Sequence, residues 1–197
     1  AASKPPPPPL FQDPVAAPIL PFAIFMASAL LASTFTQTPT VIYPLRALAV
    51  TATLALFWPA FRAMAWRVHW EGPLLGLAVG LAWIWTAPPP AATDIALATA
   101  LDALPATLFA LWAAARVFGT VALAPLVEEL FFRGYILMRL GAGGPVQRVV
   151  ALAVSSGLFA ALHDRWLAAA LAGLIFGLLA LRRGRLSDAI AAHATAN

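Results

Sequence analysis

Two carboxylates and a guanidinium lie within an apolar stretch of the sequence, "PLVEELFFRGY" at residues 125–135. A charged side chain at the centre of a bilayer costs at least about 2.5 kcal/mol, so ionisable residues in such a stretch are candidates for function. On a helix, Glu129 and Arg133 are four residues apart and share a face, which predicts an ion pair. Glu128 is rotated by about 100° from Glu129 and has fewer partners, so it is available as a general base. The alternative is that the three side chains form an inert packing network.

Two of the three histidines lie in apolar segments near the C-terminus. Phe159 and His163 are four residues apart, as are His193 and Asn197, so each pair is expected to share a helical face. A Glu–His pair can hold and deprotonate a water molecule, and a second imidazole with an amide can donate to the oxyanion of a tetrahedral intermediate. These residue types suit the hydrolysis of an amide without a covalent nucleophile.

The composition indicates a membrane protein. Of the 197 residues, 62% are apolar and 10% are charged, and the mean hydropathy is +0.86. A soluble domain has about 25% charged residues. In lipid only helices and closed barrels satisfy the backbone, and Leu/Ala-rich runs are not barrel strands. The expected fold is therefore an all-α, polytopic transmembrane bundle of about six to eight helices with a catalytic cavity inside the membrane. The net charge of +4 is assigned to basic loops, and no nucleic-acid partner is expected.

Apolar segments divide the chain, at residues 18–35, 41–61, 73–87, 106–140, 148–163, 166–182 and 186–197. The last has about 12 residues where a crossing needs roughly 20, so the sequence is expected to stop within that helix. Residues 88–105 are interpreted as a linker. The chain has no cysteine, which excludes thiolate chemistry and disulfides.

The basic residues orient the segments because cytoplasmic loops are rich in Lys and Arg. If 106–130 is one crossing, the N-terminus and the loops that hold Arg62, Arg139 and Arg182 are cytoplasmic. Glu128 would then lie near the cytoplasmic face, about 20 Å in depth from His163. To bring the two together, either the run breaks at Gly119 and Pro125, or residues 140–150 form a re-entrant segment.

Three motifs occur in order: Glu-Glu-x-x-x-Arg at 128–133, Phe-x-x-x-His at 159–163 and His-x-x-x-Asn at 193–197. This pattern, over roughly residues 115–197, resembles the CPBP family of CAAX proteases and bacteriocin-processing enzymes, also called the Abi family of glutamic-type intramembrane proteases. The resemblance implies that Glu128 activates water with His163 as its partner, and that His193 and Asn197 form the oxyanion site. It also implies no metal or other cofactor, and supporting roles for Glu129, Arg133 and Phe159.

The same resemblance implies an endopeptidase that acts on a membrane-anchored protein or peptide near its C-terminal end, in the bacterial inner membrane. The stretch "HDRWLAAALAGLIFG" is similar to members linked to bacterial C-terminal sorting systems. Residues 106–197 are expected to be the CPBP-like catalytic core and 18–105 accessory transmembrane helices. Residues 1–17 are expected to be a proline-rich N-terminal tether.

Three alternatives stay open. Two Glu and two His could ligate zinc, although the sequence has no His-Glu-x-x-His. A non-catalytic scaffold or immunity protein could keep the motifs, and a transporter could use the same residues as a proton relay. The sequence shows no inverted repeat that would favour transport. Arg46, Arg116 and His69 are interpreted as packing residues.

Overall fold

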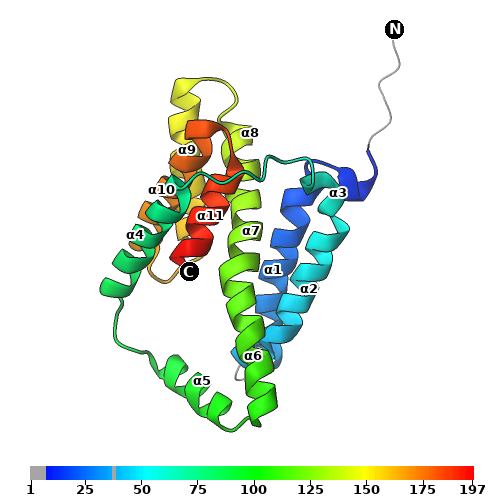
Figure 1. Ribbon diagram of the computed structural model, residues 1–197, viewed down its shortest axis with the longest axis vertical. Helices are drawn as coiled ribbons and strands as arrows, with labels where there is room; N and C mark the ends of the chain where they lie inside the picture. Colours follow the sequence, from blue (N-terminus) through cyan, green and yellow to red (C-terminus); the bar gives the residue numbers. More distant parts are fainter. Residues whose placement is uncertain (1–7, 37–38) are drawn as a thin grey trace.

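The computed structural model describes residues 8–36 and 39–197, and within these ranges the chain is a bundle of helices without strands (Figure 1). The expected all-α class is confirmed. The proline-rich lead at residues 1–7 lies outside the described residues. Short 3₁₀ turns cover Leu10–Gln12 and Pro39–Ile42. The helices are α1 (Ala16–Phe35), α2 (Tyr43–Leu56), α3 (Trp58–Phe61), α4 (Glu71–Trp85), α5 (Ala92–Asp102), α6 (Ala106–Phe118), α7 (Ala124–Glu129), α8 (Met138–Leu140), α9 (Pro145–Ala160), α10 (Trp166–Arg183) and α11 (Leu186–Ala196).

Three helical stretches in the described part of the chain are long and apolar enough to cross a membrane: α1, the run Ala106–Leu140, and α10. Helices α2, α4 and α9 are apolar but shorter. Large apolar side chains are exposed on the outside of the bundle, for example Phe35 at 81% and Trp85 at 87%. Such exposure is expected where the surrounding solvent is lipid, so the chain is an integral membrane protein.

The run Ala106–Leu140 is one continuous helix of 35 residues that joins α6, α7 and α8. Two π-helical segments, Gly119–Leu123 and Leu130–Leu137, lie on either side of α7. The apolar run expected at 106–140 is therefore a single helix. It does not end at residue 130, because it continues past Glu128 for 12 more residues, or about 18 Å. Glu128 is therefore deep in the bundle and not near the end of its helix.

Helix α9 runs back along this long helix and brings His163 to the site. Ser155 Oγ donates to the carbonyl oxygen of Phe132 at 2.8 Å, and the rings of Phe132 and Phe159 meet edge-on at 5.6 Å. Of the two arrangements expected to bring Glu128 and His163 together, a break at Gly119 and Pro125 is wrong, because the helix is continuous from Ala106 to Leu140. A short turn at residues 141–144 joins this helix to α9.

A glycine stripe packs α4 against α11, as Figure 1 shows for the two helices. A Cβ at Gly72 or Gly80 would lie 2.8 Å from the carbonyl oxygen of Asp188 or Ala196, and one at Gly76 would clash with that of Ala192. Real Cβ atoms do not come this close, so only glycine permits this backbone approach. Small residues spaced four apart are typical of close helix pairs in membranes.

Polar contacts tie α4 to the start of α11 at one end of the bundle. The backbone N–H of His69 donates to Asp188 Oδ1 at 2.7 Å, and Ser187 Oγ donates to the carbonyl oxygen of Arg67 at 2.7 Å. Glu71 Oε2 lies 3.0 Å from Arg183 Nη2. Figure 1 shows α3, α8 and the start of α11 at the end of the bundle where the chain begins, so the basic loops share one end.

Residues 88–105 are not only a linker. Most of this connection is the helix α5, none of whose residues is buried. Asp94 Oδ2 accepts a hydrogen bond from the backbone N–H of Ala91 at 2.7 Å, which satisfies one free donor at the helix start. Alanine-rich sequence of this kind has helix propensity without a marked apolar periodicity, which is why the pattern did not reveal it.

Candidate active site

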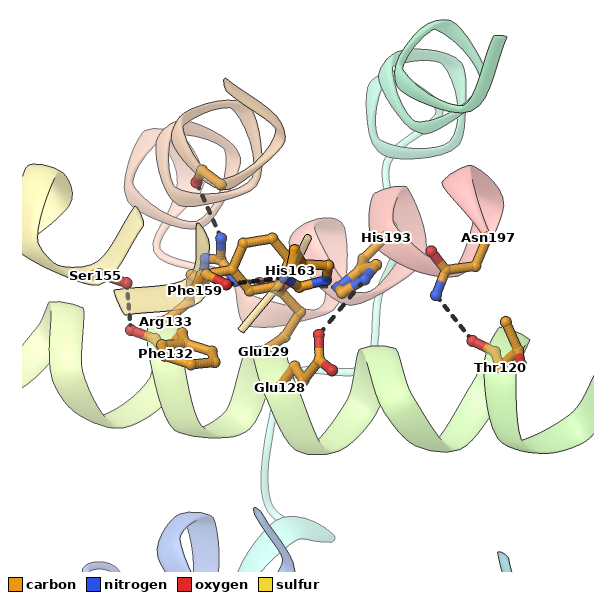
Figure 2. Close-up of polar contacts among 11 residues, drawn as sticks. Thr120, Glu128, Glu129, Phe132, Arg133, Ser155, Phe159, His163, His193 and Asn197 are labelled. Carbon is orange, nitrogen blue, oxygen red and sulfur yellow. Dashed lines mark hydrogen bonds and ion pairs between the residues drawn. The ribbon is translucent and has the colours of Figure 1, made fainter. Parts of the chain in front are cut away.

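One cavity of about 480 Å³ brings the four predicted catalytic residues together. It lies between α1, α2 and the long helix on one side and α4, α9, α10 and α11 on the other. Figure 2 shows Glu128, His163, His193 and Asn197 around it. The remaining lining residues are Phe25, Tyr43, Arg46, Val79, Trp83, Ile84, Arg116, Thr120, Ala124, Phe159, Ala172, Phe176 and Ala196. Residues up to 172 positions apart in the sequence, Phe25 and Asn197, therefore line the same cavity.

The ion pair expected from the i,i+4 spacing is present. Arg133 Nη1 donates to Glu129 Oε1 at 2.8 Å, and both side chains are fully buried. Arg133 Nη2 donates to the carbonyl oxygen of Gly173 on α10 at 3.1 Å. The guanidinium also lies 4.4 Å from the centre of the Phe159 ring. Because each charge has a partner, the pair can stay buried and fix the position of Glu129.

His193 lies between the two glutamates. Its Nδ1 is 2.9 Å from Glu129 Oε1, and its Nε2 is 3.8 Å from Glu128 Oε2. A carboxylate that pairs with Arg133 is an acceptor only, so we assign the hydrogen to Nδ1 of His193. This leaves Nε2 of His193 directed towards Glu128, and the Phe176 ring stacks on the imidazole at 4.9 Å.

His163 lies just beyond the end of α9 and faces the same cavity. Its Nδ1 lies 2.9 Å from the carbonyl oxygen of Phe159, and the two rings meet at 4.6 Å. A carbonyl only accepts, so Nδ1 carries the hydrogen and Nε2 is the free ring nitrogen. Within residues 8–36 and 39–197, the direct partner of Glu128 is His193 and not His163. Sequence spacing could not distinguish the two, because both are placed by tertiary packing.

Asn197 is anchored by an unusual feature of the long helix. In the π-segment before α7, the backbone N–H of Ala124 bonds the carbonyl oxygen of Gly119, five residues back. The next carbonyl in this register, that of Thr120, faces Pro125, which has no N–H. Asn197 Nδ2 donates to this carbonyl at 2.9 Å, as Figure 2 shows. Pro125 thus leaves an acceptor free for Asn197 across the cavity.

Several residues that line the cavity were not predicted from the sequence. Arg46 and Arg116, treated as packing residues, both line the cavity with Glu128, and so do Tyr43 and Trp83. An arginine within an apolar helix is by itself a sign of function. The rule that was applied to Arg133 would have singled out Arg46 and Arg116 as well.

The described part of the chain contains no group of three or more His, Cys, Asp or Glu side chains arranged to hold a metal ion. Glu129 Oε1 already contacts both Arg133 and His193. The zinc alternative therefore rests on Glu128 and the two free imidazole nitrogens, and a chelator is its test.

The C-terminal part of the chain matches a known protein family. Residues 103–197 match the family Rce1-like, described as type II CAAX prenyl endopeptidase Rce1-like. The match begins three residues before the expected core at 106 and includes the four predicted catalytic residues. Comparison with curated proteins and with solved structures finds no match. The predicted resemblance to CAAX proteases is confirmed for the C-terminal part of the chain, where residues 103–197 match the Rce1-like family of type II CAAX prenyl endopeptidases.

Proposed function

We propose that the chain is an intramembrane endopeptidase that cuts a peptide bond near the C-terminal end of a membrane-anchored protein or peptide. The observation that carries the proposal is a single cavity, in a membrane protein of a peptidase family, lined by Glu128, His163, His193 and Asn197. We also propose a location in a bacterial inner membrane, which the resemblance of the sequence motifs implies.

Glu128 is the proposed general base. Its Oε2 and Nε2 of His193 are 3.8 Å apart, too far for a hydrogen bond but close enough for one water molecule to contact both. His163 supplies a second free Nε2 in the same cavity and orients the water from the other side. The water gives a proton to Glu128 while its oxygen attacks the carbonyl carbon of the substrate.

His193 and Asn197 are the proposed oxyanion site. Glu129 accepts from Nδ1 of His193 and so fixes the orientation of the ring. With a proton on Nε2 as well, His193 donates to the oxyanion from that nitrogen. Asn197 provides an amide donor on the same helix. The proton on Glu128 then passes to the nitrogen of the leaving peptide as the C–N bond breaks. No covalent intermediate with the protein forms.

The remaining predicted residues support this geometry. Arg133 holds Glu129, and the ring of Phe159 lies against both Arg133 and His163. Residues 106–197 are the proposed catalytic core. Residues 18–105 are accessory helices that complete the cavity wall, and 1–17 are the proposed tether.

The test is product identification by mass spectrometry after incubation of membrane-anchored peptides with purified protein in lipid. The wild type is expected to release a short C-terminal fragment, and Glu128→Gln is expected to release none. Asp102→Asn is the matched control, because Asp102 is an exposed carboxyl on α5, away from the cavity. Equal cutting by Glu128→Gln would refute the proposed role. Binding without cutting by any of the proteins would favour a non-catalytic scaffold.

A further inference from the structure

Two arginines that line the cavity form no close ion pair within residues 8–36 and 39–197. Arg46 Nε donates to the carbonyl oxygen of Phe25 at 3.2 Å, and its guanidinium lies 3.9 Å above the Phe25 ring. Arg116 lies 4.7 Å above the Tyr43 ring. Neither forms an ion pair with a carboxylate in the described part of the chain, which differs from the closed Glu129–Arg133 pair. Each guanidinium therefore keeps free donors directed at the cavity.

The charges that line the cavity are unbalanced. Arg46 and Arg116 carry two positive charges and Glu128 one negative charge, so the lining has an excess of at least one positive charge, and of two when His193 is protonated on both nitrogens. An uncompensated charge in an apolar bundle costs free energy. A bound ligand of opposite charge would reduce this cost. A ligand with one negative charge therefore fits. Two guanidinium groups suit a carboxylate, whose two oxygens can accept from both.

The distance between Arg116 and Glu128 indicates which carboxylate of a peptide substrate the arginines could bind. Arg116 precedes Glu128 by 12 residues on one continuous helix, an axial separation of about 18 Å. The two side chains take up part of this length. The remainder accommodates two to four extended residues at about 3.3 Å each. A peptide whose scissile carbonyl lies at Glu128 would thus reach Arg116 with a group two to four residues further on.

We propose that Arg46 and Arg116 bind the free C-terminal carboxylate of the substrate and so set how far from the chain end the protein cuts. This inference rests on the proposed peptidase function. Arg46 reaches the carboxylate from α2 and Arg116 from α6, and the Phe25 and Tyr43 rings hold the two guanidinium groups in place. The accessory helices are then part of substrate recognition.

The test of the carboxylate site compares the binding of two membrane-anchored peptides. One has a free C-terminal carboxylate, and the other has the same sequence with a C-terminal amide. Glu128→Gln protein in phosphatidylcholine nanodiscs is used, so that binding is measured without cutting. A hydrogen-bonded ion contact predicts about 10- to 100-fold weaker binding of the amide. Adding Arg46→Gln or Arg116→Gln should reduce this ratio to within about twofold, whereas Arg139→Gln, an exposed arginine on α8, should keep it.

Each outcome decides between specific alternatives. Equal binding of acid and amide by protein with both arginines intact overturns the inference, even if the wild type cuts peptides. Binding that ignores the peptide terminus but rises with phosphatidylglycerol would assign the arginines to a lipid phosphate instead. Discrimination between acid and amide without cutting by the wild type would keep the carboxylate site and refute the proposed peptidase function.

Discussion

Replacement of Gly76 by alanine should disturb the site through the α4–α11 contact. A Cβ at Gly72 would lie 2.8 Å from the nearest carbonyl oxygen, and this distance must grow by roughly 0.6 Å to reach an ordinary contact of 3.4 Å. For a Cβ at Gly76 the corresponding distance must grow by more than about 1 Å. The atom it meets is the carbonyl oxygen of Ala192, which precedes His193 in α11. Overpacking of this kind costs about 1–3 kcal/mol. A displacement of 1 Å in a catalytic group costs about 10²-fold in rate.

The expected result for Gly76→Ala is therefore a loss of about 10²-fold in kcat/KM for peptide cleavage, with a lower Tm in detergent. Gly157→Ala is the matched control. Gly157 is also in an apolar helix, but a Cβ there would meet nothing within 4 Å, so alanine should leave both quantities unchanged or raise the Tm slightly. Wild-type kcat/KM in Gly76→Ala would refute the argument that this contact positions His193.

Three further changes have defined consequences. Arg133→Gln leaves Glu129 as an uncompensated buried charge and should lower the free energy of unfolding by about 3–5 kcal/mol, as measured by denaturant titration in micelles. Pro125→Ala supplies an N–H for the Thr120 carbonyl, so we expect the oxyanion site to weaken and kcat/KM to fall about fivefold, while the Tm does not fall. The backbone N–H groups of Ala16 and Val15 hold the pKa of Asp13 below its ordinary value. Its contribution to stability is complete above a pH of about 4 and is lost as the pH falls through the lower folded-state pKa. The difference in Tm between the wild type and Asp13→Ala should shrink between pH 6 and pH 2, and an unchanged difference would contradict this assignment.

Local spacing predicted those parts of the site that depend on a single helix. The four-residue interval placed Glu129 beside Arg133, and the same interval placed the Phe159 ring beside His163. The first pair follows from helix geometry alone. His163 lies in the turn after α9, so its contact with Phe159 also depends on the conformation of that turn. The composition likewise predicted the helical membrane bundle, because lipid leaves the backbone few other ways to satisfy its hydrogen bonds.

Contacts between helices could not be predicted in this way. His193 contacts both glutamates because α11 packs against the long helix, and nothing in its own spacing indicates this. The two π-segments beside α7 change the residue register that helix spacing rules assume. The glycine stripe at Gly72, Gly76 and Gly80 is visible in the sequence, but its partner helix is not.

The central claim is that Glu128 activates water without a metal ion. The most direct measurement is the rate of peptide cleavage by the wild type and by Glu128→Gln, each in lipid with and without a strong zinc chelator. We expect a wild-type rate that the chelator leaves unchanged and a loss of at least about 10²-fold in Glu128→Gln. A wild-type rate that falls on chelation and returns with added zinc would contradict it, as would a Glu128→Gln rate close to that of the wild type.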